Sequence, residues 1–306
     1  MDISLDHFDY LFSQRNKNCC YRCVRIEEKG FGIVAIRNIK LGELILQERP
    51  LLSWTNYASL KSQFDNLSKS EKDAVLNLSN SHSELGDELQ GIANTNGFLS
   101  ESTESMCLFL TASRLNHSCI PNIQSVYISP ELRVYASCDI SEDEELCINY
   151  LPLWKSPGTI KQNLKKQYRF VCNCELCSME DQGQIKKIMN YRLRYGNIVE
   201  SVSKKYINGE KIKLHSIMQI FETLKKAKLC FPHLILAHSI DGFEIAMKLK
   251  MLSKAKTFIK RAYQANFIVF GEHCVSNRIF QEMIDYLEID ESRPNNKSII
   301  VFNSLV

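Results

Sequence analysis

The sequence has no long hydrophobic run and no large excess of charge. No run of about 18 apolar residues occurs in the 306 residues, so we expect neither a transmembrane helix nor a membrane partner. The net charge is +3 and the pI about 8.2. This is too mild to predict nucleic-acid binding, which is typical of domains with a pI above about 9 and clustered lysine and arginine. The segment Met1–His7 is acidic and lacks an apolar stretch, so we expect no secretory signal and a reducing compartment.

Cysteine, by contrast, is abundant, with twelve residues in the chain. Cys172, Cys174 and Cys177 lie within six residues, a spacing too tight for a disulfide framework, and in a reducing compartment it favours metal ligation. A second group, residues 19–23, also contains three cysteines but no evident fourth ligand nearby. For that group, packed thiols are favoured over a second metal site.

The first half of the chain carries short apolar runs separated by turn signals, which predict strands. We expect a hairpin between Gly30–Ile36 and Glu43–Glu48 with Gly42 at the bend. A second strand pair is predicted over 123–128 and 132–138, and a further strand is predicted to end at Tyr150.

Helical patterns occur in four other places. A short helix is predicted over residues 5–14, and within the polar segment 58–92 the stretch Lys69–Leu78 predicts a helix with Ser70 as its N-cap. A basic helix is predicted over 160–168. From 184 to 292 apolar residues recur at helical spacing and predict four to six antiparallel helices. A plain helical bundle and tetratricopeptide-like helix pairs both fit this pattern, and no 34-residue repeat is visible.

Four short motifs occur in a fixed order along the chain. They are Lys29-Gly-Phe-Gly32, Arg114-Leu-Asn-His-Ser-Cys-Ile-Pro-Asn122, Leu146-Cys-Ile-Asn-Tyr150 and Cys172-Asn-Cys-Glu-Leu-Cys177. Each alone is a weak signal. Together they resemble the SET-domain protein lysine methyltransferases, most closely the SET–MYND (SMYD) branch, over roughly residues 20–180 and more loosely over the helical tail.

The resemblance implies an α+β fold. A mostly-β SET domain with short strands and a knotted C-terminal segment would be followed by a zinc-bound post-SET segment and an α-helical, tetratricopeptide-like C-terminal domain. The expected divisions are an N-terminal helix at 1–20, the SET domain at 21–155 with its helical insert at about 58–92, the post-SET segment at 156–180 and the helical domain at 184–292. Residues 55–92 contain no cysteine and only one histidine, His82, so we expect no MYND zinc finger there.

The resemblance also implies S-adenosylmethionine-dependent methyl transfer to a lysine of a histone or non-histone protein. It implies one structural zinc ion held by Cys172, Cys174, Cys177 and, as fourth ligand, Cys119; a closed shell of four sulfurs leaves no position for catalysis. The cofactor residues carried over from the family are Lys29, Gly30, Phe31, Asn96, Ser113, Leu115, Asn116, His117, Tyr150, Tyr168 and Phe170. One departure is visible, because family members commonly carry arginine where Phe31 stands.

Tyr150 is the predicted catalytic residue. Methyl transfer to an amine is an in-line displacement that needs a neutral lone pair about 3–3.5 Å from the methyl group. A free lysine has a pKa near 10.4, so only about one in two thousand is neutral at pH 7. An apolar channel beside a sulfonium lowers that pKa, and a tyrosine hydroxyl can orient the amine without acting as a strong base.

Two alternatives stay open at this point. The chain could be a catalytically weak or inactive SET-fold protein that binds partners through its helical tail, since Phe31 departs from the family. A zinc-ribbon nucleic-acid binder fits poorly, because the basic residues are dispersed and the cysteine spacing differs. We expect a monomer with a protein or peptide lysine substrate, located in the nucleus, the cytoplasm or both.

Overall fold

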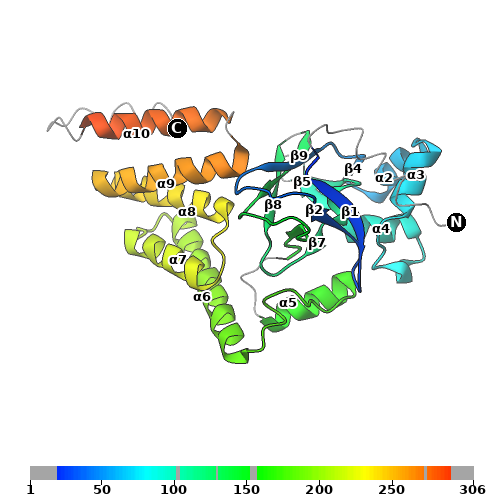
Figure 1. Cartoon of the computed structure of the whole chain (residues 1–306). Coiled ribbons are helices and arrows are strands. Elements are labelled where there is room, and N and C mark those ends of the chain that lie inside the picture. The colour runs from blue at the N-terminus through cyan, green and yellow to red at the C-terminus, as the bar shows by residue number, and fades with distance from the viewer. Residues whose placement is uncertain (1–18, 101–103, 129, 152–156, 272–273, 291–306) are drawn as a thin grey trace. The chain divides into compact units, whose positions relative to one another are not determined.

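The structure is a computed structural model that describes residues 19–100, 104–128, 130–151, 157–271 and 274–290 (Figure 1). The chain divides into two compact units, Met1–Leu193 and Arg194–Val306. The helix expected over 5–14 lies outside the described residues.

Short strands dominate the middle of the first unit and form four small sheets among the described residues. Antiparallel pairing forms three of the sheets, and β7 pairs with β10 in parallel. The sheets are β1 (Tyr21–Ile26) with β2 (Gly30–Ala35); β3 (Leu44–Glu48), β9 (Glu131–Ala136) and β8 (Ile123–Ile128) in that order; β4 (Leu52–Trp54), β6 (Ser105–Leu108) and β5 (Phe98–Ser100) in that order; and β7 (Asn116–His117) with β10 (Cys147–Ile148).

The hairpin expected between the second and third strands is wrong. β2 pairs with β1, and β3 pairs with β9 from much later in the chain. The connector is held by a long-range bridge, in which Ile39 and Ile140 exchange backbone hydrogen bonds of 2.9 Å. Gly42 does form a turn at φ +82°, but its N–H donates to Ala136 on β9. The predicted pairing of β8 with β9, by contrast, is confirmed.

Three helices fill the stretch between β4 and β5, namely α2 (Tyr57–Asp65), α3 (Lys69–Leu76) and α4 (Glu88–Asn96). The N-cap of α3 is Ser68, so the expected cap at Ser70 is wrong. Ser68 Oγ accepts from the Glu71 N–H at 3.3 Å, and the Glu71 carboxylate accepts from the Ser68 N–H at 2.9 Å. This reciprocal capping box requires a glutamate three residues after the cap, which Ser68 has and Ser70 lacks.

Two apolar clusters hold these elements together. The strands β2, β3 and β9 bury residues such as Ile33, Leu46 and Val134 in one cluster, against which Tyr150 packs from the edge. The helical insert buries Leu60 and its neighbours against β4 and β6 in a second cluster. The segment around Tyr150 is therefore supported by packed strands. Such support holds the side chains of a functional site in a fixed geometry.

The first unit ends in α5 (Pro157–Asn163), a π-helical turn over Leu164–Tyr168 and the start of α6 (Gln182–Ile207). The second unit contains the rest of α6 and α7 (Leu214–Lys226), α8 (Pro232–Lys248), α9 (Leu252–Phe270) and α10 (Val275–Asp290), and from α7 onward consecutive helices pack together. The predicted helical C-terminal region is confirmed. The knotted segment and the tetratricopeptide-like character stay predictions. No helix within the described ranges is long and apolar enough to cross a membrane.

Candidate functional site

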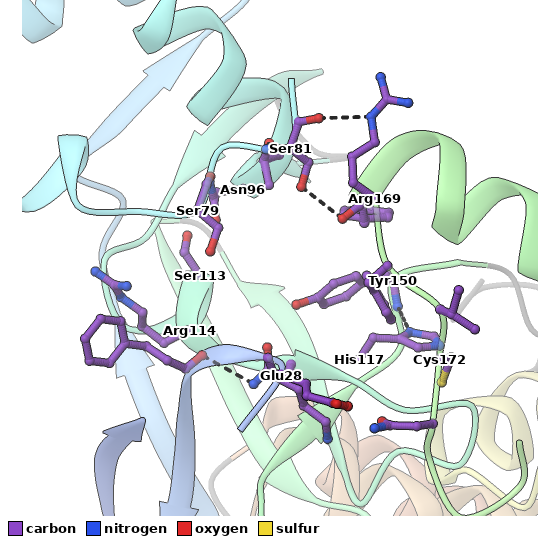
Figure 2. A pocket seen from close by; sticks show the side chains of 18 residues that line it. Glu28, Ser79, Ser81, Asn96, Ser113, Arg114, His117, Tyr150, Arg169 and Cys172 are labelled. Carbon is purple, nitrogen blue, oxygen red and sulfur yellow. Dashed lines mark hydrogen bonds between the residues drawn. The ribbon is translucent and has the colours of Figure 1, made fainter. Parts of the chain in front are cut away.

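A cavity of about 480 Å³ opens in the first unit where segments distant in sequence meet. Every residue predicted to contact a cofactor lines it except Gly30 and Leu115. In Figure 2, Ser79, Ser81 and Asn96 lie on one side of the cavity, and His117, Tyr150 and Cys172 lie on another. The lining consists of Glu28, Lys29, Phe31, Ser79, Ser81, Thr95, Asn96, Ser113, Arg114, Asn116, His117, Tyr150, Tyr168, Arg169, Phe170, Val171, Cys172 and Asn173.

Asn116 connects the first motif to the wall of the cavity. Its Nδ2 donates to Glu145 Oε1 at 2.9 Å and to the Phe31 carbonyl at 3.3 Å. Gly32 permits this approach, because a Cβ there would lie 2.7 Å from Asn116 Nδ2. The motif glycine at position 32 is thus explained by the close approach of a side chain.

Lys29 forms an ion pair with the same glutamate, with 2.6 Å between Lys29 Nζ and Glu145 Oε2. Burial lowers the pKa of Lys29, but the hydrogen bond and negative charge of Glu145 outweigh it, so that the pKa is raised overall. Lys29 is therefore a fixed cation at the cavity wall at neutral pH.

His117 lies between the cavity and the cysteine cluster. The parallel pairing of β7 with β10 sets His117 opposite Ile148 and so close to Tyr150. His117 Nδ1 accepts from the Tyr150 backbone N–H at 3.1 Å, and its Nε2 lies 3.4 Å from Cys119 Sγ. One imidazole thus couples the position of Tyr150 to the cysteines.

Tyr150 has a fixed, neutral hydroxyl. Its O–H donates to the Leu115 carbonyl at 2.7 Å, which gives the predicted residue Leu115 a role through its backbone although it does not line the cavity. Burial raises the pKa of Tyr150 above its ordinary value, so the phenol keeps its proton at neutral pH. It can orient a polar group but is not poised as a base.

The aromatic wall is built around Tyr150. Its ring centroid lies 4.7 Å from that of Tyr168 and 6.4 Å from that of Phe170, the latter edge-on at 89°. Such rings favour both flat heterocycles and cations.

A set of contacts between Arg169, Glu84 and Ser81, which we call the clasp, holds this aromatic wall and was not predicted from the sequence. Arg169, in the left-handed region at φ +60°, pairs with Glu84 at 2.6 Å and donates to the Ser81 carbonyl at 3.3 Å. Ser81 Oγ donates back to the Tyr168 carbonyl at 3.1 Å. No sequence signal relates the loop at 81–84 to position 169, because only the fold brings them together.

Ser113 supplies a buried hydroxyl to the cavity. Its Oγ has no hydrogen-bond partner within the described part of the chain. Buried polar atoms are nearly always satisfied, so an orphaned hydroxyl in a cavity wall points to a ligand. Beside it, the Arg114 guanidinium lies 5.2 Å from the centre of the Phe31 ring, and so Phe31 takes part in a cation–π contact. Arg114 is a lining residue that the sequence analysis did not single out.

The four predicted metal-binding cysteines come together. The sulfur atoms of Cys119, Cys172, Cys174 and Cys177 all lie within 4.8 Å of one another. Cys119 Sγ lies 3.8 Å from that of Cys177 and 4.0 Å from that of Cys172. Zinc–sulfur bonds of about 2.3 Å in a tetrahedron separate sulfurs by about 3.8 Å, so the cluster could bind a metal ion.

The other cysteines do not join such a group among the described residues. Cys20 lies just before β1 and is buried, with 1% of its surface exposed, and Cys19 Sγ donates to the Tyr21 carbonyl at 3.1 Å. Burial raises the pKa of Cys20 to about 11, as for an ordinary core thiol.

The comparisons with known proteins agree with this geometry. The SET domain family matches residues 30–151. The histone-lysine N-methyltransferase set5 of Schizosaccharomyces pombe is 27% identical over 250 residues, covering 80% of this chain and 77% of that protein. A SET domain-containing protein of Acanthamoeba polyphaga mimivirus is 26% identical over 236 residues, or 62% of this chain and 92% of that protein.

The SMYD branch matches over a shorter region. The histone-lysine N-methyltransferase SMYD3 of Homo sapiens is 39% identical over 75 residues, which is 24% of this chain and 18% of that protein. Residues 30–151 therefore match the SET domain family, and part of the chain also resembles SMYD members.

Proposed function

We propose that this chain is an S-adenosylmethionine-dependent protein-lysine methyltransferase with a structural zinc ion. The observation that carries the proposal is the convergence on one cavity of motif residues from separate parts of the SET domain, Lys29, Asn116 and Tyr150 among them. The names of the relatives, histone-lysine N-methyltransferases in two cases, support the same reaction. We extend the proposal to a histone or non-histone protein substrate and to a location in the nucleus, the cytoplasm or both.

The residues present fit the cofactor. Its adenine is flat and its sulfonium cationic, and Tyr168 and Phe170 offer aromatic faces to such groups. Its amino-acid end needs hydrogen-bonding groups, which Asn116 and the orphaned Ser113 hydroxyl can supply. When bound, the cofactor supplies an electrophilic methyl group.

Tyr150 would position the substrate amine. Its hydroxyl is held at the Leu115 carbonyl, so the two oxygens together present a fixed polar pair to an incoming N–H group. The lysine must shed its proton to water before it reacts, and an apolar channel favours that loss because it disfavours the charged form. The protein contributes alignment and desolvation more than proton transfer.

We assign the route of the substrate lysine to a second cavity. It measures about 570 Å³ and is lined mainly by apolar side chains, including Phe98, Tyr127 and Leu132. Two sheet edges, β5 and β8, form its walls, and each pairs with a single strand among the described residues. Exposed edges can pair with an extended peptide. Phe98, Tyr127 and Tyr150 pack against the same apolar cluster, which leads us to place the substrate peptide on this side.

Phe98→Ala tests that route. We expect KM for a lysine peptide to rise about 10-fold while kcat and the Kd of S-adenosylmethionine stay near wild type, because an apolar contact that holds substrate and transition state alike is lost. Steady-state kinetics and calorimetry measure the two effects, with the exposed Leu41→Ala as control. An unchanged KM in an active enzyme would show that the peptide enters elsewhere.

Asn116→Ala tests the cofactor site itself. We expect calorimetric titration of zinc-loaded protein to show a Kd for S-adenosylmethionine raised about 10- to 100-fold, since a hydrogen bond to a charged group contributes about 1.5–3 kcal/mol. Asn77→Ala is the matched control, because Asn77 is exposed at the end of α3. Wild-type protein that binds zinc but no cofactor would refute the methyltransferase proposal and favour a scaffold role.

A further inference from the structure

Arg192 is buried beside the cysteine cluster. It lies on α6, within the first unit, and has 0% of its surface exposed, as one of the largest fully buried side chains of the described chain. Its Nη2 donates to the carbonyl of Cys119 at 3.0 Å. A buried guanidinium is costly unless a negative group accompanies it, so its surroundings need an explanation.

The cysteine cluster lies next to this guanidinium, because the carbonyl that accepts its hydrogen bond belongs to Cys119, one of the four clustered cysteines. A divalent ion held by four thiolates carries a net charge of −2, because four negative sulfurs exceed the two positive charges of the metal. Four neutral thiols carry no charge, so loss of the metal would remove this negative charge from beside Arg192.

We propose that Arg192 is the counter-ion of the four-cysteine metal site, and that this contact ties α6 to the cysteine cluster when the metal is bound. The proposal rests on the metal site proposed above. Arg192 would be a positioning residue that never touches the metal. Groups just outside a metal's ligand shell typically change metal affinity 10- to 100-fold when replaced.

The competing explanation is a purely structural one, in which Arg192 serves through packing and hydrogen bonds, such as the one to the Cys119 carbonyl, and its charge does not affect the metal. Two substitutions separate the two roles. Arg192→Gln keeps an N–H donor and loses the charge, whereas Arg192→Lys keeps the charge and loses the planar fork. Arg194→Gln is the matched control, because Arg194 lies two residues on along α6 and is exposed.

The experiment uses the full-length protein loaded with Zn²⁺ alone and follows metal release to a chromogenic chelator at neutral pH. We expect release from Arg192→Gln to be about 10- to 100-fold faster than from wild type, with Arg192→Lys between them and Arg194→Gln unchanged. We also expect the gain in Tm on adding Zn²⁺ to be smaller in Arg192→Gln than in wild type, since ligand stabilisation follows affinity.

The results that would overturn the proposal are distinct from those that would refute methyl transfer. Equal release rates from wild type and Arg192→Gln would show that the charge of Arg192 has no effect on the metal and that its role is structural. Wild-type protein that retains no Zn²⁺ would overturn both the metal site and its counter-ion. Wild-type protein that retains Zn²⁺ but does not bind S-adenosylmethionine would refute the proposed activity. The Arg192 proposal would then still be decided by the rates of metal release from wild type and Arg192→Gln.

Discussion

Replacing Tyr150 with phenylalanine is expected to lower kcat for the proposed methyl transfer by about 100-fold or more. The substitution removes one hydroxyl, which donates to the Leu115 carbonyl at 2.7 Å and which we propose orients the substrate amine. Alignment errors of about 1 Å can cost about 100-fold in rate. The ring remains, and with it the packing against Tyr168, so the Kd of S-adenosylmethionine should change little.

Single-turnover kinetics with a saturating lysine peptide would measure this effect, and calorimetry would measure cofactor binding. Tyr135→Phe is the control, because Tyr135 is a buried tyrosine on β9 that does not line the cavity. A Tyr150→Phe variant that retains wild-type kcat would rule out the hydroxyl as a positioning group. Because the pKa of Tyr150 is raised, we expect no loss of rate from ionisation of this phenol as the pH rises from 7 to 10.

Replacing Cys119 with alanine is expected to lower Tm by roughly 10 °C and to weaken cofactor binding. Loss of a metal belongs to the few single changes that cost about 4 kcal/mol or more, and each 1 kcal/mol shifts Tm by about 2–4 °C in a domain of this size. Cofactor binding should suffer because Cys119 Sγ lies 3.4 Å from His117 Nε2, and because Phe170 shortly precedes Cys172 in the cavity wall.

Differential scanning calorimetry and zinc analysis of purified protein would measure this loss. Cys107→Ala is the matched control, since Cys107 is equally buried on β6 but has no place in the cluster. Treating wild-type protein with a chelator should reproduce the Cys119→Ala phenotype and should leave that variant unaffected. Equal Tm losses in the two cysteine variants would mean that the cluster is no more than packed thiols.

The sequence predicted the residues of the candidate site more completely than it predicted the pairing of the strands. The Asn-His-Ser-Cys motif, Tyr150 and the cysteine spacing predicted the members of the cavity wall and of the cysteine cluster, because such residue types are rarely combined without a ligand to bind. Local patterns also predicted the hairpin of β8 and β9 correctly, since their partners lie next to each other in the chain. The helical C-terminal region followed from helical spacing of apolar residues, which is again a local property.

Tertiary structure decided what depends on partners far away in the chain. β3 pairs with β9 rather than with β2 because apolar residues from both ends of the SET domain must share one core. The clasp between Arg169 and Glu84 joins segments 85 residues apart, and no local pattern marks either residue. From the sequence, Arg192 would be predicted to be an exposed charge on a helix. The tertiary structure instead buries it against Cys119. Residue type and spacing therefore determined which chemistry is available, whereas long-range packing determined which charges are buried and which side chains hold the site in place.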